Sequence, residues 1–175
     1  MTQRNDVTPP QLNIAVRVDE PDWQTTFDDL QATLEKTLTT AFELSWHGVF
    51  AGPVQMAEVS LLLTDNETVK TLNRDYRNQD KPTNVLAFAV LDGEDTGPRP
   101  EGAPVMLGDI IMAYGVLMTE AGDKKIQPSS HLCHLVVHGM LHLLGFDHQS
   151  DDEAGEMEAM ESRILKKLGV ADPYE

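Results

Sequence analysis

Three histidines near the end of the chain have the spacing of metal ligands. His138 and His142 are four residues apart, so on a helix of ~3.6 residues per turn their imidazoles project from one face and can bind one cation. Gly145 can end that helix in the left-handed conformation, which turns the chain and leaves His148 free to complete the group. Neutral imidazole suits Zn²⁺, and three protein ligands leave a tetrahedral ion one open position. The spacing therefore predicts one catalytic zinc ion per chain, bound by His138, His142 and His148.

The alternative is that these histidines have ordinary structural roles in a helix. However, half of the six histidines fall within residues 138–148, on an apolar stretch where unpaired polar groups are costly to bury. The spacing also equals that of the metzincin peptidases, H-E-x-x-H-x-x-G-x-x-H. Gly139 stands where those enzymes have the glutamate that acts as general base. Peptidase chemistry of that kind is therefore not expected.

The histidine segment resembles a known family signature. Residues 138–148 read H-G-M-L-H-L-L-G-F-D-H, which is similar to H-G-x-L-H-L-x-G-(Y/F)-D-H of the YbeY family of bacterial endoribonucleases. Three upstream segments are also similar to motifs of that family: L-N-R-D-Y-R at 72–77, K-P-T-N-V-L-A-F at 81–88 and L-G-D-I at 107–110. With a helix at 157–169, the resemblance covers about residues 58–170. Ala87 and Ala89 replace the serine and proline usual in the family, which argues against a hydroxyl group acting at position 87.

The resemblance implies a zinc-dependent endoribonuclease specific for single strands. Its expected roles are maturation of ribosomal RNA, including the 3′ end of the small-subunit RNA, and ribosome quality control. Its expected partners are therefore single-stranded and ribosomal RNA and ribosomal particles. Arg77 matches the arginine of the family and is the candidate catalytic residue, because a guanidinium group can clamp the scissile phosphate and offset charge in the transition state.

Two other functions remain open at this point. One is a metallohydrolase of another substrate class, such as a peptidase with an unconventional base. The other is a ribosome-assembly factor whose metal only stabilises the fold, without hydrolytic activity. The sequence determines neither the cleavage site nor the nucleophile, which is either water or the RNA 2′-hydroxyl.

Four further residues near the motifs have two interpretations each. Asp109 and Asp147 can orient a ligand histidine, or they can be a structural hydrogen-bond partner and a turn residue, respectively. His134 lies one turn before His138 and could line the cleft, although a structural role is favoured. Cys133 is expected to be a small buried apolar residue, with metal ligation as the alternative.

Composition limits the architecture and the compartment. With 175 residues, 41% of them hydrophobic, the chain is long enough for one domain. We expect that domain at 11–170, between a flexible N-terminal tail at 1–10 and a short C-terminal tail at 171–175. The sequence contains no apolar run near the ~18 residues that span a bilayer and no signal-peptide core. A single cysteine fits a reducing compartment, so a cytoplasmic protein without membrane attachment is expected, of undetermined oligomeric state.

The formal net charge of −16 argues against non-specific binding of nucleic acid. Charge distribution matters more than the sum, however, and four basic residues cluster in one short segment: Lys70, Arg74, Arg77 and Lys81. Asp75 and Asp80 dilute this cluster. The alternative interpretation is a solvated helix face, on which Arg77 forms a surface ion pair with one of the two aspartates.

Periodicity predicts an α+β fold with one sheet of about four strands, surrounded by helices, one of which is a buried metal-binding helix. Alternating apolar residues indicate a half-buried first strand, and longer apolar runs indicate the others. The expected strands span about 12–18, 56–63, 85–91 and 105–112. The expected helices span about 22–44, 66–77, 114–124, the histidine segment and a last acidic helix that Gly169 ends. Residues 92–104, rich in glycine and proline, are expected to form a mobile loop.

Overall fold

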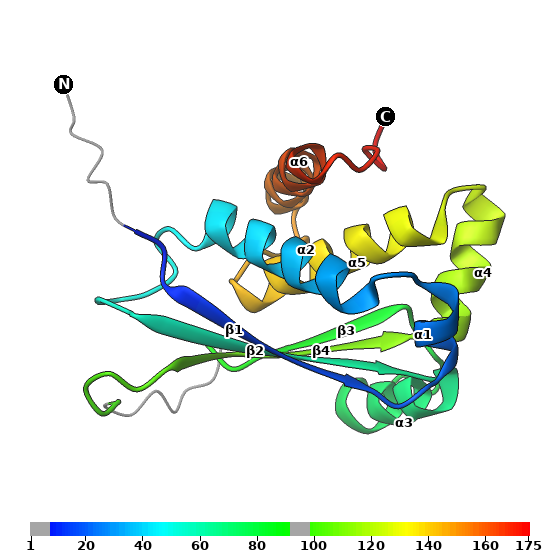
Figure 1. The fold of residues 1–175 in the computed structure, drawn as a ribbon, viewed down its shortest axis with the longest axis horizontal. Helices are drawn as coiled ribbons and strands as arrows, with labels where there is room; N and C mark the ends of the chain where they lie inside the picture. The colour runs from blue at the N-terminus through cyan, green and yellow to red at the C-terminus, as the bar shows by residue number, and fades with distance from the viewer. Residues whose placement is uncertain (1–7, 92–98) are drawn as a thin grey trace.

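The computed structural model describes residues 8–91 and 99–175, and Figure 1 shows their arrangement. The strands of the described residues are β1 (Gln11–Val18), β2 (Met56–Thr64), β3 (Val85–Ala89) and β4 (Val105–Ala113). The helices there are α1 (Asp22–Thr26), α2 (Leu30–Ser45), α3 (Asn66–Arg77), α4 (Tyr114–Lys124), α5 (Pro128–Leu143) and α6 (Asp151–Leu168). The predicted α+β fold with one four-stranded sheet is confirmed.

The sheet is mixed, with the strand order β1-β2-β4-β3. β1, β2 and β4 are parallel, whereas β3 pairs with β4 in the antiparallel direction and forms one edge of the sheet. Alternate residues of β2 are buried under the helices: Ala57, Val59, Leu61 and Leu63. The intervening residues point to the other face, so the period of two in the sequence corresponds to two chemically different faces.

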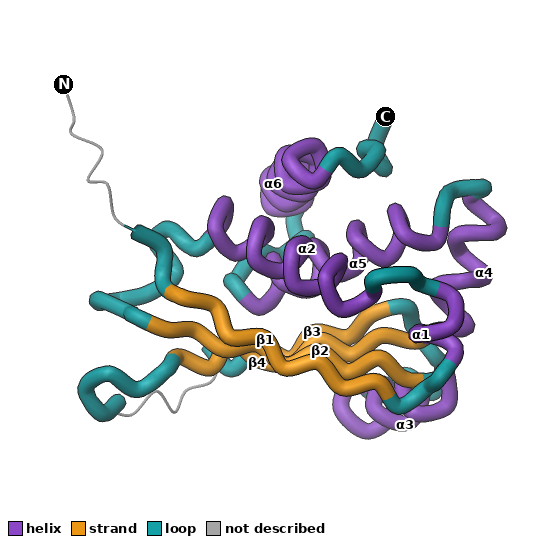
Figure 2. The backbone as a smooth tube through the Cα atoms, in the orientation of Figure 1, coloured by secondary structure: helices purple, strands orange, loops and turns teal. Residues whose placement is uncertain are grey.

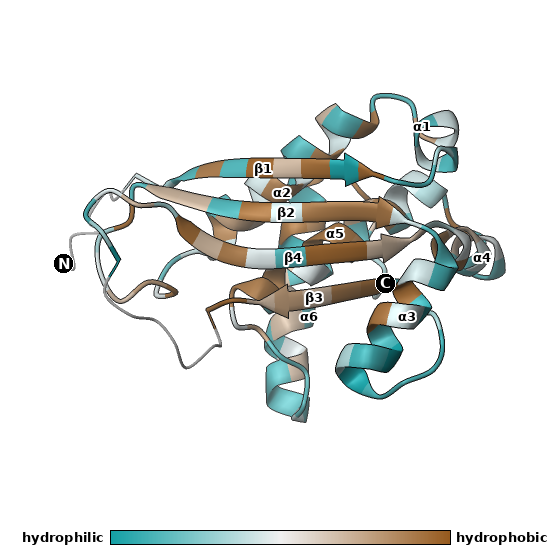
Figure 3. Ribbon diagram, turned by 90° about the horizontal axis from the view of Figure 1, so that it is seen from below, coloured by the Kyte–Doolittle hydropathy of each residue, from teal (hydrophilic) through white to brown (hydrophobic). Residues whose placement is uncertain are grey.

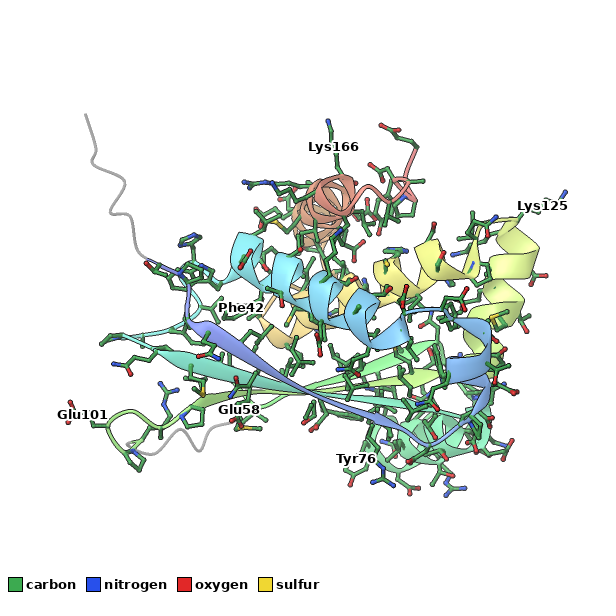
Figure 4. All side chains as sticks on the ribbon, viewed as in Figure 1. Phe42, Glu58, Tyr76, Glu101, Lys125 and Lys166 are labelled. Carbon is green, nitrogen blue, oxygen red and sulfur yellow. The ribbon has the colours of Figure 1, made fainter. Side chains whose placement is uncertain are left out.

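The helices are concentrated on one face of the sheet. α2 and α5 lie directly on that face, and α6 packs on the outer side of these two helices (Figure 2). Of the helices in residues 8–91 and 99–175, α3 alone lies against the opposite face, near one end, and much of that face is not covered by a described helix (Figure 3). Figure 4 shows Phe42 of α2 turned toward the sheet and Tyr76 of α3 projecting outward, and the exposed fraction of Tyr76 is 71%.

The expectation of a single helix over 22–44 was wrong, because the chain forms two helices there. Asp29 has a φ of 51° and lies between α1 and α2. Two buried aromatic residues fix this break: the Trp23 indole N–H donates to the Thr64 carbonyl at 3.0 Å, and the Trp23 ring stacks on Phe27 at 5.7 Å. Apolar residues recur at helical spacing throughout 22–44, but packing against residues distant in sequence, at the end of the sheet, determines that the helix is interrupted.

The remaining boundaries agree with the predictions within a few residues. The strand expected at 85–91 ends at Ala89, and α3 ends at Arg77 as predicted. Residues 1–7 of the expected tail and 92–98 of the expected loop lie outside the described residues. No helix in the described part of the chain combines the length and the apolar character needed to cross a bilayer.

Gly108, in the L-G-D-I segment, permits the close contact between β4 and β3. Its φ is 137°, and the register between β2 and β4 shifts by one residue immediately before it, as in a β-bulge. A Cβ atom at this position would lie 2.0 Å from the carbonyl oxygen of Phe88. Both the backbone conformation and the available space therefore require glycine.

We predict that Gly108→Ala lowers the free energy of unfolding by at least about 2 kcal/mol, because the new methyl group must displace the β3 backbone. Urea denaturation measures this change. Gly155→Ala is the matched control: Gly155 lies within α6, and a Cβ atom at this position would meet no atom within 4 Å. Alanine there should leave stability unchanged or raise it by up to ~1 kcal/mol. Equal stability of the Gly108→Ala protein and the wild type would contradict the steric argument.

Candidate metal centre

Helix α5 packs closely on the sheet because Gly139 faces β4. A Cβ atom at Gly139 would lie only 3.0 Å from Cγ2 of Ile110, so a larger residue would require the Ile110 side chain or the helix to shift. Most of the remaining α5 residues are buried. His138 and His142 are partly exposed and line a cleft beside the edge strand β3.

The structure brings the three predicted ligands together. One ring nitrogen from each of His138, His142 and His148 lies within 4.8 Å of the others. The Nε2 atoms of His138 and His142 are 3.0 Å apart, close to the ~3.3 Å between two nitrogens that bind one tetrahedral Zn²⁺ at ~2.0–2.1 Å. Gly145, with a φ of 93°, turns the chain after α5, and His148 follows this turn and lies beside the pair. A set of three imidazoles fits zinc in both chemistry and spacing.

A hydrogen bond on the far side of the His142 ring determines which of its nitrogens faces the other two histidines. His142 Nδ1 lies 3.1 Å from the carbonyl oxygen of Phe146, and a carbonyl only accepts, so Nδ1 carries the proton and Nε2 presents a lone pair. Burial, together with neighbouring His138 and His148, lowers the pKa of His142 to about 4. At neutral pH this imidazole is therefore in the unprotonated form that binds metals.

Sequence reasoning missed Glu161, which contacts the site from α6. Its Oε1 lies 2.5 Å from Nδ1 of His138, and its Oε2 lies 3.1 Å from Nε2 of His134 and is also hydrogen-bonded to the Tyr174 hydroxyl. Burial raises the pKa of Glu161, but these hydrogen bonds outweigh burial and lower it to about 2. A signal was present in the sequence, since a lone carboxylate interrupts the apolar stripe of α6 from Met157 to Leu168.

The structure bears on the four residues that have two interpretations each in the sequence. Asp109 is exposed on the uncovered face of the sheet, so it does not orient a ligand histidine. Asp147 lines the cleft and accepts the backbone N–H of His148 at 2.7 Å, which is the contact of a turn residue. His134 does not line the cleft. Cys133 is buried in the core, as expected, and is not part of the histidine group.

Arg77 lines the same cleft, which has a volume of about 740 Å³. Its Nη2 donates to the carbonyl oxygen of Ala87 at 2.9 Å, and its guanidinium carbon lies 5.6 Å from the centre of the Phe88 ring. Within the described residues no carboxylate pairs with Arg77, since Asp75 pairs with Arg74 at 3.0 Å. The interpretation that Arg77 forms an ion pair with Asp75 or Asp80 is therefore wrong. At position 87 the contact to Arg77 is made by the backbone carbonyl, since alanine has no hydroxyl group.

Comparisons with known proteins identify one family model and several relatives that match this chain. The family model Endoribonuclease YbeY matches residues 17–169. A protein of Rhodospirillum rubrum named Endoribonuclease YbeY is 47% identical over 167 residues, which cover 93% of this chain and 82% of the relative. One of the same name from Paramagnetospirillum magneticum is 45% identical over 163 residues, covering 93% and 96% of the two chains. The solution structure of TM1509 from Thermotoga maritima aligns with 93% of this chain and 99% of that chain, at 21% identity and a TM-score of 0.48. From these sequence matches, which extend over most of its length, we conclude that the chain belongs to the YbeY endoribonuclease family.

Proposed function

We propose that this protein is a zinc-dependent endoribonuclease that cleaves single-stranded RNA. The observation that carries the proposal is the convergence of three imidazoles and one guanidinium group on a single cleft. Relatives named Endoribonuclease YbeY, at 47% and 45% identity, support RNA as the substrate. The proposed process is maturation of ribosomal RNA, including the 3′ end of the small-subunit RNA, together with ribosome quality control.

The histidines have the properties required to bind the metal. His138 and His142 present Nε2 atoms that are directed by hydrogen bonds at Nδ1, and His148 approaches from the turn that follows α5. When bound, Zn²⁺ would act as a Lewis acid toward a phosphoryl oxygen and would lower the pKa of water. All three histidines line the cleft, so a phosphodiester bound there would lie beside the metal.

Arg77 is the proposed ligand of the scissile phosphate. A guanidinium group has five N–H donors, and the Ala87 carbonyl accepts from only one nitrogen of Arg77. The remaining donors are available to phosphate oxygens, and the contact with the Phe88 ring restricts the position of the side chain. A preorganised cation at this position would offset the negative charge that develops during phosphodiester cleavage.

The proposed partners are single-stranded and ribosomal RNA and ribosomal particles, in the cytoplasm. Family membership supports them. Lys70 and Lys81 belong to the same segment of the chain as Arg77, which lines the cleft, whereas Arg74 is paired with Asp75, and the net charge of the whole chain is −16. Local charge of this kind can steer a polyanion toward one part of an acidic surface.

We predict that metal-loaded protein cleaves a single-stranded ribosomal RNA fragment and leaves casein intact. A zincin peptidase requires a carboxylate within reach of the metal-bound water, and at the corresponding position Gly139 has no side chain and packs against Ile110. Electrophoresis of both substrates, with and without a chelator, measures the two activities. Chelator-sensitive loss of casein would indicate the peptidase alternative, and two intact substrates would indicate an assembly factor.

The ligand assignment predicts about one zinc ion per chain in the purified protein and a loss of most of it in His142→Ala. The variant removes one of three ligands and leaves the apolar contacts of α5 in place. Elemental analysis of dialysed protein measures the metal content. His47→Ala is the control, because His47 is an exposed loop residue outside the group. Equal zinc content in the His142→Ala protein and the wild type would remove His142 from the ligand set.

For Arg77 we predict that Arg77→Ala lowers the rate of RNA cleavage at least tenfold, equivalent to about 1.4 kcal/mol of barrier. Zinc content and melting temperature should remain close to those of the wild type. Arg77→Lys should recover only part of the rate, because an ammonium group lacks the planar fork that binds two phosphate oxygens. Arg74→Ala is the matched control, since Arg74 lies one turn earlier and pairs with Asp75. Full activity of folded, zinc-loaded Arg77→Ala protein would exclude the phosphate contact.

A further inference from the structure

Glu161 is a buried carboxylate whose hydrogen bonds connect three parts of the chain. Its exposed fraction is 1%, and burial of a carboxylate is costly unless donors satisfy its oxygens. The donors come from α5, as His134 and His138, and from the C-terminal segment, as Tyr174. Glu161 itself does not line the cleft.

The two carboxylate oxygens have different partners. Oε2 contacts both His134 Nε2, at 3.1 Å, and the Tyr174 hydroxyl. Oε1 contacts His138 Nδ1 at 2.5 Å. Because the contacts on Oε2 fix the orientation of the carboxylate, they also aim Oε1 at the His138 ring.

This contact determines the tautomer of His138. A carboxylate only accepts hydrogen bonds, so Nδ1 of His138 carries the proton of the neutral ring, and Nε2 of that tautomer presents its lone pair. That Nε2 atom faces Nε2 of His142 at 3.0 Å. The backbone carbonyl of Phe146 has the same effect on His142. The two histidines of the helix are thus oriented by different means, one by a neighbouring carbonyl and one by a side chain from another helix.

We propose that Glu161 is a positioning residue of the metal centre, held in place by Tyr174, so that metal affinity depends on two side chains outside the cleft. The inference rests on the proposed ligand set of the preceding subsection. Carboxylates that accept from the second nitrogen of a ligand histidine commonly change metal affinity about 10–100-fold. The competing explanation is that Glu161 and Tyr174 only attach α6 and the C-terminal segment to α5, without effect on the metal.

Zinc affinity of the full-length chain, measured by competition with a chromophoric chelator at neutral pH, separates the two explanations. Glu161→Gln keeps the size of the side chain but removes its charge, and we expect a loss of affinity of about 10-fold or more. Tyr174→Phe removes one hydroxyl from a side chain that is 47% exposed, and we expect a loss of about threefold, the scale of one hydrogen bond. Glu156→Gln, at an exposed position of α6, and Tyr76→Phe should bind zinc as the wild type does.

A second measurement reports the tautomer directly. The ¹⁵N shifts of the His138 ring in metal-free protein should show protonated Nδ1 in the wild type. Glu161→Gln should increase the other tautomer, because a glutamine amide can also donate toward Nδ1. Urea denaturation of the metal-free variants measures the purely structural contribution. Lower stability with unchanged zinc affinity and an unchanged tautomer would overturn the proposal.

Failure of this inference and failure of the proposed function give different results. If Glu161→Gln does not fold, Tyr174→Phe decides, and wild-type zinc affinity in that variant overturns the proposal that metal affinity depends on this pair of side chains. Wild-type protein that binds zinc without cleaving RNA would contradict the proposed nuclease activity. The zinc affinities of the Glu161→Gln and Tyr174→Phe variants would still test the present proposal. Wild-type protein that binds no zinc would overturn both the ligand set and this inference.

Discussion

The close approach of α5 to the sheet at Gly139 is the constraint on which the rest of the site depends. A side chain there would meet Ile110 of β4, so glycine allows the helix backbone to lie near the strand. The neighbouring turns of α5 are then buried on most sides, which limits the positions where polar side chains can emerge. His138 and His142 emerge beside β3, whose small residues Ala87 and Ala89 leave room for the cleft.

Three histidines of α5 contact carboxylates from the two flanking helices. Glu120 of α4 contacts His131 at 2.7 Å, and Glu161 of α6 contacts the next two histidines along the helix. Burial lowers the pKa of His131 although the bond to Glu120 opposes this effect. Imidazoles can occupy this environment because each acceptor offsets part of the cost of removing a ring nitrogen from water.

Local patterns in the sequence predicted those features whose cause is local. The spacing of His138, His142 and His148 follows from helix geometry and one turn, and the strands follow from alternating burial. Features caused by distant contacts were not predictable in the same way. The break at Asp29 depends on the burial of Trp23 and Phe27. The position of Asp109 on the uncovered face depends on the register shift between β2 and β4 before Gly108, because strict alternation would put Asp109 on the same face as buried Leu107. Glu161 is 23 residues from His138 in sequence, so no local period relates the two residues.

The compactness of the ligand segment also has a consequence for the unfolded chain. The proposed ligands His138, His142 and His148 span eleven consecutive residues, so loop closure between them costs little entropy even without a fold. An unfolded chain would therefore retain a peptide able to chelate the same ion. Binding to the unfolded state reduces the stabilisation that a ligand gives to the native state. Zinc should consequently raise the thermal stability of this protein by less than its affinity for the native site alone implies. Contacts outside the segment, such as that of Glu161 with His138, would account for the higher zinc affinity of the native state relative to the unfolded state.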